Sequence, residues 1–363
     1  MERILRYVTH GFTVIESEDY MIKSPSKSID FNNLSFLPVQ TPFSYVSYYK
    51  DGKWDEGKVT DGTTLSLHML STGIQYGQQA FEGMKCYRRQ DGGVQFFRPY
   101  DNAKRFQKSC QRIMMPEIPI EKFIDAICQT VVANSDYVPP YESKATLYVR
   151  PFMIGIGSNL ILAPSKEYLF GVVTQPVGLF FKSGLTPSNF TVSEYDRAAA
   201  KGTGDIKVGG NYAASFYPNY LAKKDGFTDC LYLDPLTHTK IDEGGAANFF
   251  AITKDGAFVT PKSASILPSI TKRALIDIAR DMLKMKVIEG DVDVNQLDLY
   301  CEAGTCGTAA IITPIGGLMY QNQLHTFGNP KEAGPVTKEL YRLLVGIQFG
   351  DIIAPEGWIL DVK

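Results

Sequence analysis

Lys207 stands in the stretch of the chain best suited to covalent chemistry. The adjacent glycines Gly209 and Gly210 follow it closely, and the hydroxyl of Tyr212 comes five residues after it. Because glycine has no Cβ, backbone or a flat ligand can approach closely at such a place. A partly desolvated lysine there has a lowered pKa and becomes a usable nucleophile. Taken alone, the pattern is also typical of a surface lysine in a flexible loop, because short motifs match by chance.

Two later segments could bind an anion. Residues 267–271, Leu-Pro-Ser-Ile-Thr, lead into a run with apolar residues at helical spacing. The N-terminus of a helix suits a phosphate because its N–H groups are free and its dipole end is positive. Capping by Ser269 or Thr271 is the simpler alternative. Residues 304–310, Gly-Thr-Cys-Gly-Thr-Ala-Ala, form a turn of small residues that could offer a hydroxyl and N–H groups to an anion.

Other candidate residues with charged side chains lie on predicted elements or next to them. Glu243 precedes four small residues and a strand-like run. Arg105 lies on a predicted helix, either as a solvated charge or as an anion ligand. Tyr148 and Arg150 share one face of the strand-like run 146–152, because side chains two residues apart in a strand point the same way.

The elements that must position these residues follow from hydrophobic periodicity. Alternation predicts strands at residues 94–98, 146–152, 168–174 and 230–234. Helical spacing of apolar residues predicts helices that start at about residues 101, 120 and 335. The aromatic residues Tyr76 and Phe81 are either core or the wall of a pocket, and these residues alone favour core.

The helix after the lysine has its own start and stop signals. Asn211 is the predicted N-cap, and Asp225-Gly226 is the predicted end. Pro218 falls inside this helix and is expected to kink it.

The composition is typical of a globular protein with a large core. A length of 363 residues favours two domains, and we place the boundary near residues 176–186. The net charge of −2 gives no reason to expect nucleic acid or an anionic membrane as a partner. The start of the chain has no signal-peptide core, and no apolar stretch is long enough to span a bilayer, so we expect a cytoplasmic protein.

Metal and nucleotide motifs are not supported. The six cysteines and four histidines are scattered without the spacing of a metal site. Gly202-Thr203-Gly204 resembles part of a phosphate loop, but it lacks the closing lysine and the preceding strand. A phosphate- or nucleotide-binding protein without catalysis, using residues 202–210 as its anion loop, is the remote alternative.

Taken together and in order, the motifs resemble those of the branched-chain aminotransferases, which are pyridoxal-phosphate enzymes of the class IV aminotransferase fold. The shared motifs are Tyr-Gly-Gln-Gln-Ala-Phe-Glu-Gly-Met-Lys, Leu-Tyr-Val-Arg-Pro, Lys-Val-Gly-Gly-Asn-Tyr, Glu-Gly-Gly-Ala-Ala-Asn-Phe-Phe, Leu-Pro-Ser-Ile-Thr, Gly-Thr-Ala-Ala and Gly-Pro-Val-Thr. They extend over about residues 40–360, and so many ordered motifs rarely match by chance.

The resemblance implies a role for each candidate residue. Lys207 would bind the cofactor aldehyde, Glu243 the pyridine nitrogen and Tyr212 the phenolic oxygen of the ring. The residues implied to hold the phosphate are Arg105, Ile270, Thr271 and Thr308. The residues implied to meet substrate carboxylates are Tyr148, Arg150 and the backbone at Ala309 and Ala310. The residues implied to line the apolar side-chain pocket are Tyr76, Phe81 and Phe180.

The resemblance also implies an α+β fold and a reaction. We expect an N-terminal extension and small α/β domain at residues 1–176, an interdomain loop at 177–186, and a large cofactor-binding domain at 187–363 with a barrel-like sheet and flanking helices. The expected enzyme is a homodimer that moves nitrogen from leucine, isoleucine or valine to 2-oxoglutarate. The same fold also serves D-amino-acid aminotransferases and aminodeoxychorismate lyases, which stay open as alternatives.

The chain departs from the family pattern at two places of note. Several relatives carry tyrosine at the position of Phe180, so a pocket hydroxyl is missing here. The animal enzymes carry a redox Cys-x-x-Cys after Gly-Thr-Ala, whereas this chain has Ala-Ile-Ile-Thr at residues 310–313, so we expect that switch to be absent.

Overall fold

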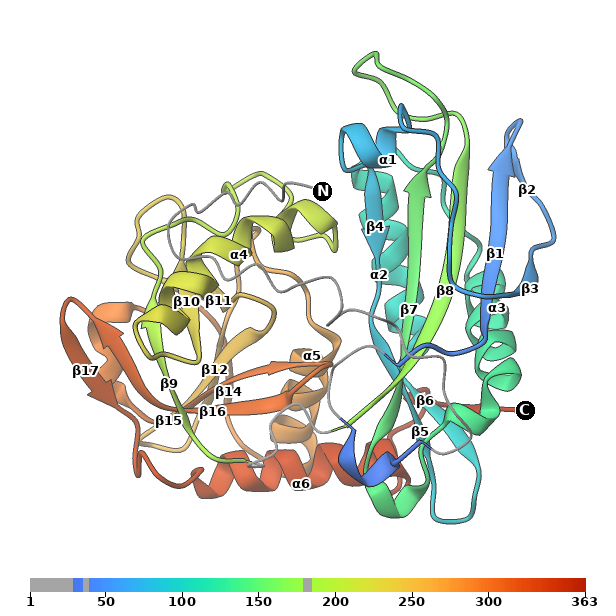
Figure 1. Ribbon diagram of the computed structural model, residues 1–363. Helices are drawn as coiled ribbons and strands as arrows, with labels where there is room; N and C mark the ends of the chain where they lie inside the picture. Colours follow the sequence, from blue (N-terminus) through green and yellow to red (C-terminus); the bar gives the residue numbers. More distant parts are fainter. Residues whose placement is uncertain (1–28, 35–38, 179–184) are drawn as a thin grey trace, which may run out of the picture.

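A computed structural model of the chain describes residues 29–34, 39–178 and 185–363. Two β-sheets lie side by side, each with its own helices, and α6 runs along one end of both (Figure 1). The described part contains no helix that combines the length and the apolar character needed to cross a bilayer.

The first sheet is antiparallel and has nine strands in the order β18-β6-β5-β7-β8-β1-β2, with β3 on β1 and β4 on β7. Its strands are β1 (Phe43–Lys50), β2 (Lys53–Trp54), β3 (Lys58–Asp61), β4 (Gln79–Phe81), β5 (Met84–Arg88), β6 (Val94–Phe97), β7 (Thr146–Gly155), β8 (Tyr168–Val177) and β18 (Ile359–Val362). Its helices are α1 (Thr72–Gln75), α2 (Pro99–Arg112) and α3 (Ile120–Ala133). Phe106 of α2, Phe123 of α3 and Phe170 of β8 are fully buried and pack ring against ring at the centre of its core.

The second sheet closes on itself. Strands β11-β10-β9-β16-β15-β12 are paired in sequence, and Glu243 of β11 pairs back with Asn248 of β12, which completes a ring of six strands. The strands are β9 (Ser188–Val192), β10 (Asp229–Leu233), β11 (Ile241–Gly244), β12 (Asn248–Thr253), β13 (Phe258–Pro261), β14 (Val287–Gly290), β15 (Tyr300–Gly307), β16 (Ile311–Tyr320) and β17 (Gln323–Thr326). Its helices are α4 (Gly209–Lys224), α5 (Ile270–Asp277) and α6 (Pro335–Phe349). This ring confirms the predicted barrel-like sheet.

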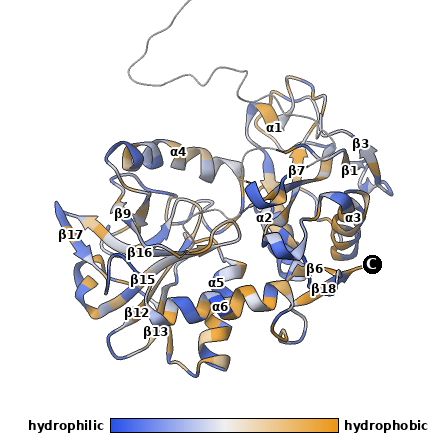
Figure 2. Cartoon of the chain, turned by 60° about the horizontal axis from the view of Figure 1, so that its bottom comes forward, coloured by the Kyte–Doolittle hydropathy of each residue, from blue (hydrophilic) through white to orange (hydrophobic). Residues whose placement is uncertain are grey.

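The two halves are joined by more than the connecting chain. The last strand, β18, returns from the end of the chain and pairs with β6 of the first sheet. Gln95 of β6 donates hydrogen bonds to the carbonyls of Ile347 and Gln348 at the end of α6. Hydrophobic and hydrophilic residues alternate along α6 (Figure 2), as expected for a helix that packs on the protein along one face. The end of the chain therefore ties the barrel to the first sheet.

Helix α4 starts differently from its prediction. The helix begins at Gly209 after Val208, so Asn211 is not its N-cap. The side chain of Asn211 instead donates hydrogen bonds to the carbonyls of Thr203 and Ile206, which lie just before the lysine. The helix continues through Pro218 and ends at Asp225 as expected.

Candidate active site

A cavity of about 330 Å³ lies where the first sheet faces the barrel. Its lining includes nine of the residues selected from the sequence, namely Lys207, Arg105, Tyr212, Glu243, Thr308, Phe81, Tyr148, Arg150 and Ala309. They come from both halves of the chain. One side supplies α2, β4 and β7, and the other supplies α4, the segment just before it that carries Lys207, β11 and the turn after β15. The fold therefore assembles distant motifs into one site.

The backbone of Lys207 is hydrogen-bonded to the first half of the chain on both sides. Its N–H donates to Ser109 Oγ of α2 at 2.9 Å, and its carbonyl accepts from the N–H of Phe81 at 3.1 Å. The next residue, Val208, forms a β-bridge with Ala80. These contacts fix the lysine backbone at the junction of the two halves.

The side chain of Lys207 points into an aromatic and partly desolvated place. Its Nζ donates to Tyr212 Oη at 2.6 Å and lies 4.9 Å from the ring centres of both Phe81 and Tyr212. Burial, and then repulsion from Arg105, lower the pKa of Lys207 to about 8. A larger fraction of this amine is therefore neutral near pH 8 than for an ordinary lysine, as a nucleophile requires.

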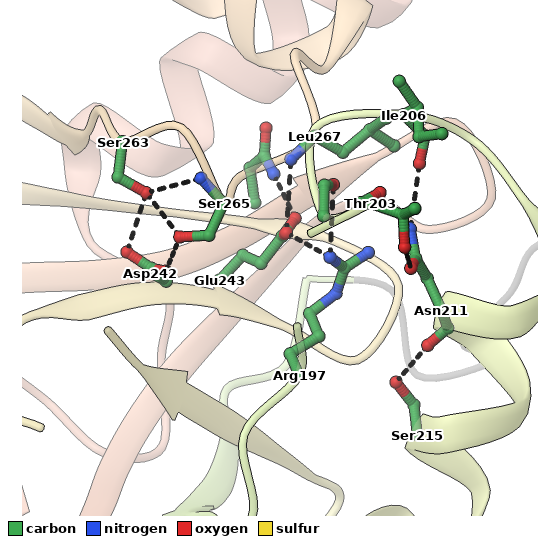
Figure 3. A network of polar contacts seen from close by, with 12 residues as sticks. Arg197, Thr203, Ile206, Asn211, Ser215, Asp242, Glu243, Ser263, Ser265 and Leu267 are labelled. Carbon is green, nitrogen blue, oxygen red and sulfur yellow. Dashed lines mark hydrogen bonds and ion pairs between the residues drawn. The ribbon is translucent and has the colours of Figure 1, made fainter. Parts of the chain in front are cut away.

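Glu243 is held by three partners from three different segments, and Figure 3 labels two of them, Arg197 and Leu267. It is buried, and its Oε1 lies 2.7 Å from Arg197 Nη1 and accepts from the N–H of Leu267 at 3.2 Å. Its Oε2 accepts from Asn248 Nδ2 at 2.7 Å. Burial raises the pKa of Glu243 to about 7 in spite of the nearby arginine. The carboxyl group is thus fixed in direction and can share a proton with a ring nitrogen near neutral pH.

Arg105 is positioned by a buried carboxylate that the sequence analysis did not select. Glu82 is fully buried, and its two oxygens accept from Arg105 Nε at 2.7 Å and Nη2 at 2.8 Å. Burial favours a higher pKa for Glu82, but the Arg105 pair and the amide of Asn102 outweigh it and lower the pKa. The Nη1 of Arg105 donates to the carbonyl of Pro268. Among the described residues these three bonds use three of the five guanidinium donors, so two remain for an anion.

Tyr148, Arg150 and Phe81 form one wall of the cavity. Arg150 Nη2 donates to Tyr148 Oη at 3.1 Å, and the guanidinium lies 4.7 Å from the ring centre of Phe81. A Cβ at Gly83 would come within 1.9 Å of Tyr148 Oη, so this position needs a glycine for the tyrosine to lie where it does. The wall is therefore apolar, with an arginine and a hydroxyl at its edge.

Two of the residues implied to hold a phosphate, Ile270 and Thr271, lie at the first turn of α5. Ser269 is the N-cap and accepts from the N–H of Lys272, as the simpler interpretation expected. Ser269 also lines the cavity, and Ile270 and Thr271 follow it, both buried. Thr308 enters the cavity from the turn between β15 and β16. The helix start and the turn therefore approach the same region.

Three of the selected positions, Tyr76, Ala310 and Gly209, have other places in the structure. Tyr76 is 45% exposed, lies outside the cavity lining and donates its hydroxyl to the carbonyl of Leu160. Ala310 borders an adjoining cavity of about 280 Å³ that shares Ala309 with the first. Phe180 lies outside the described residues. Gly209 meets the side chain of Gln79 rather than the cavity, so the close approach expected there is between two parts of the protein.

Four residues of the site escaped the sequence analysis, namely Glu82, Ser109, Arg197 and Asn248. Glu82 and Asn248 lie inside the quoted motifs, so their place in the motifs was the available signal. Ser109 and Arg197 act through contacts with residues far along the chain, and no local pattern marks them.

The cavity fits an anionic, polar cofactor such as pyridoxal phosphate. Its lining carries four cationic side chains, Arg105, Arg150, Arg197 and Lys207, against the single carboxylate of Glu243. Three buried polar atoms of lining residues find no hydrogen-bond partner within the described chain: Arg150 Nε, Arg197 Nε and Asn248 Oδ1. Buried polar atoms without a partner cost free energy, and three of the seven such atoms in the described chain belong to residues of this lining.

The sequence matches the family described as Amino-transferase class IV over residues 79–317. It is 54% identical over 342 residues to the branched-chain-amino-acid aminotransferase of Haemophilus influenzae, covering 93% of this chain and 100% of that protein. The structure of the Escherichia coli branched-chain amino acid aminotransferase is similar with a TM-score of 0.74 at 26% identity, covering 88% of this chain and 99% of the other. The Thermobaculum terrenum branched-chain amino acid aminotransferase in its PLP-form also gives a TM-score of 0.74, at 24% identity over 89% and 99% of the two chains, a likeness of fold alone.

Proposed function

The chain belongs to the class IV aminotransferase family, and we propose that it transfers the amino group of L-leucine, L-isoleucine or L-valine to 2-oxoglutarate with pyridoxal 5′-phosphate as cofactor. The observation that carries this proposal is the cavity whose lining brings Lys207 and Glu243 together with cationic and aromatic side chains. The family, the fold and the reaction predicted from the motifs agree with the relatives.

The phosphate of the cofactor would be held where the two halves of the chain meet. Arg105 supplies a guanidinium fixed by Glu82, and Thr308 supplies a hydroxyl. The first turn of α5, at Ile270 and Thr271, supplies N–H groups and the positive end of the helix dipole. Charge-assisted bonds of this kind are stronger than neutral ones, so the phosphate would be the main anchor.

The ring of the cofactor would be held by two residues of the lining, Glu243 and Tyr212. Glu243 would pair with the pyridine nitrogen, and Tyr212 would donate to the phenolic oxygen. When bound, pyridoxal phosphate supplies an electron sink that stabilises negative charge at the substrate Cα. Lys207 Nζ would bind the aldehyde of the cofactor. Once the substrate amine takes its place there, the freed Lys207 amine would take the proton from the substrate Cα as a general base and return it to the cofactor carbon on the far side of the substrate nitrogen.

The substrate wall explains how one site accepts both an apolar side chain and a dicarboxylate. Phe81 and the ring of Tyr148 offer an apolar surface, and Arg150 lies over both rings at 4.7 and 5.2 Å. A methyl-rich side chain packs against the rings, whereas the second carboxylate of glutamate can pair with the arginine. The site therefore suits the two alternating substrates of the reaction.

We also propose that the enzyme is a homodimer. Large apolar residues are exposed together on α1, on the loop before it and on the loop after β7: Met69, Ile74, Leu160, Ile161 and Leu162, each at least half exposed. Tyr76 lies within this surface through its bond to Leu160. A contiguous apolar surface of this kind is typical of an interface between subunits.

We also propose a cytoplasmic location. It fits the six free cysteines, because thiols stay reduced there.

An amino-acid panel tests the substrate assignment. The purified holoenzyme should turn over L-leucine, L-isoleucine and L-valine with 2-oxoglutarate, and Lys207→Ala should lose this turnover by several orders of magnitude. Faster turnover of D-alanine than of L-leucine would instead assign the protein to the D-amino-acid branch of the same fold.

A further inference from the structure

A buried lysine, Lys85, connects the first sheet to the turn beside the active site. It lies on β5, is 5% exposed, and its Nζ donates to the carbonyl of Ala309 at 2.8 Å. The strand register places it directly opposite Tyr148 of β7. Directly opposite residues of an antiparallel pair lie on the same face of the sheet, so Lys85 and Tyr148 share a face.

The turn that Lys85 contacts has a strained backbone. Strands β15 and β16 make their last pair at Gly307 and Ile311, which leaves residues 308–310 as the turn. Ile311 has a φ of +66°, in the left-handed region. A β-branched side chain is rarely found there, and such a conformation persists only when surrounding contacts hold it. The turn therefore needs external support, and the Lys85 bond supplies one such contact.

Fixing the Ala309 carbonyl fixes the whole peptide unit to which it belongs. The peptide unit is planar and trans, so the C=O of Ala309 and the N–H of Ala310 point in opposite directions. Thr308 and Ala309 belong to the cavity lining, and Tyr148 faces the same cavity. The lysine bond thus sets the direction of the polar groups that the turn presents next to Tyr148.

We propose that Lys85 is a positioning residue for substrate carboxylates: by holding the Ala309 carbonyl, it keeps the 308–310 turn in the form that binds a carboxylate beside Tyr148. This inference rests on the proposed aminotransferase function. It assigns to Lys85 an effect on substrate affinity rather than on cofactor affinity. Of the proposed cofactor partners the turn carries only Thr308, and the others lie on or beside α2, α4, α5 and β11.

Burying the amine of Lys85 costs desolvation free energy, so a lysine at this position points to a role for its amine. Burial lowers the pKa of Lys85 to about 7. An amine N–H donates to a carbonyl whether or not the nitrogen is charged, so the link to Ala309 exists in both protonation states. An apolar side chain of similar length would fill the space at a lower desolvation cost but could not hold the carbonyl.

The test compares binding of a carboxylate with binding of the cofactor. The probe is 4-methylvaleric acid, which is leucine without its amino group, titrated into the holoenzyme while the visible absorbance of the cofactor is followed. Lys85→Met should raise the Kd of the probe and the KM for leucine about tenfold, the effect of losing one strong hydrogen bond. Its kcat, cofactor affinity and visible spectrum should stay close to those of the wild type, and Lys85→Arg should recover most of the probe affinity.

Lys122→Met is the matched control. Lys122 also donates to backbone carbonyls, those of Asp55 and Glu56, but lies away from the cavity. This variant should bind the probe like the wild type. A Lys85→Met enzyme whose probe Kd stays within twofold of the wild type would overturn the inference, as would equal losses in Lys85→Arg and Lys85→Met. A wild-type protein that binds cofactor but transaminates no branched substrate would instead contradict the proposed function.

Discussion

At the scale of single residues, the site is built from charges that are held by other charges. Arg105 is fixed by Glu82, and Glu243 is fixed by Arg197 and Asn248. Removing one member of a buried pair leaves the other uncompensated, which costs more than the pair contributes. The residues that surround the predicted catalytic groups therefore matter as much to the geometry as the groups themselves.

The lowered pKa of Lys207 predicts the pH dependence of cofactor attachment. The neutral amine is the reactive form, so its fraction rises with pH and reaches one half at the pKa, about 8 in the folded protein. The rate at which apoenzyme combines with pyridoxal phosphate should therefore rise with a midpoint near pH 8. Stopped-flow absorbance at a series of pH values measures it. A midpoint close to that of an ordinary lysine, about 10.4, would show that the site does not desolvate the amine.

At the scale of elements, a buried glutamate holds the start of α6. Glu302 of β15 accepts from the N–H groups of Val336 and Thr337 and from the hydroxyl of Thr337. A Cβ at Gly334 would lie 2.0 Å from the Glu302 carboxyl carbon, so only glycine lets the carboxylate reach the helix. This cap comes from a distant strand, and it fixes a helix that contacts both sheets.

Glu302→Ala should therefore destabilise the protein without impairing catalysis. The helix loses its cap and keeps unpaired N–H groups, a cost of about 2 kcal/mol. Urea unfolding of the holoenzyme should show a lower midpoint, with kcat per folded molecule unchanged. Glu339→Ala is the control, because Glu339 pairs with Arg342 on the exposed face of α6 and should cost less than about 0.5 kcal/mol. Equal midpoint shifts in the two variants would argue against the cap.

The geometry of β15 excludes a disulfide bond between two of its own cysteines, Cys301 and Cys306. Cys301 and Cys306 lie on the same extended strand. Five residues of strand span about 16 Å, whereas a disulfide needs Cα atoms within about 7 Å. The two cysteines therefore cannot pair within this fold, and they do not replace the redox motif that the animal enzymes carry.

Local patterns predicted most elements and many site residues, but not the contacts that hold them. Helix α3 and strand β7 follow from periodicity, because their buried faces repeat at the period of the element. Asn211 was expected to be an N-cap, but its amide binds the loop before Lys207, since the helix starts two residues earlier. Arg197 left no local signal, because it lies in a loop and its partner Glu243 lies far along the chain on β11. Such contacts depend on the assembled fold, which no window of sequence contains.

At the scale of the whole molecule, the chain is organised around one junction. Lys207 is bonded to Ser109 and Phe81, Lys85 reaches Ala309, and β18 returns to the first sheet. We therefore retain the proposed division at residues 177–186, with the last strand of the large domain contributed to the sheet of the small one. Motion between the halves would change the site directly, since its walls come from both.

The exposed apolar surface predicts the oligomeric state. Ile161→Asp together with Leu162→Asp should convert a dimer into monomers of 40.3 kDa, because charges on this surface would have to be desolvated in the interface. Light scattering after size-exclusion chromatography measures the mass. Ile353→Asp is the control, since Ile353 is 95% exposed on the segment after α6 and should leave the dimer intact. A monomeric wild type, or a dimeric double variant, would contradict the proposed interface.

The central claim is that the amine of Lys207 is the one that bonds to the cofactor in this cavity. The most direct measurement is to reduce the holoenzyme with borohydride, digest it, and locate the phosphopyridoxyl group by mass spectrometry. We predict one labelled peptide, with the added mass on Lys207. A label on another lysine, or no label on protein reconstituted with pyridoxal phosphate, would contradict the assignment of the site.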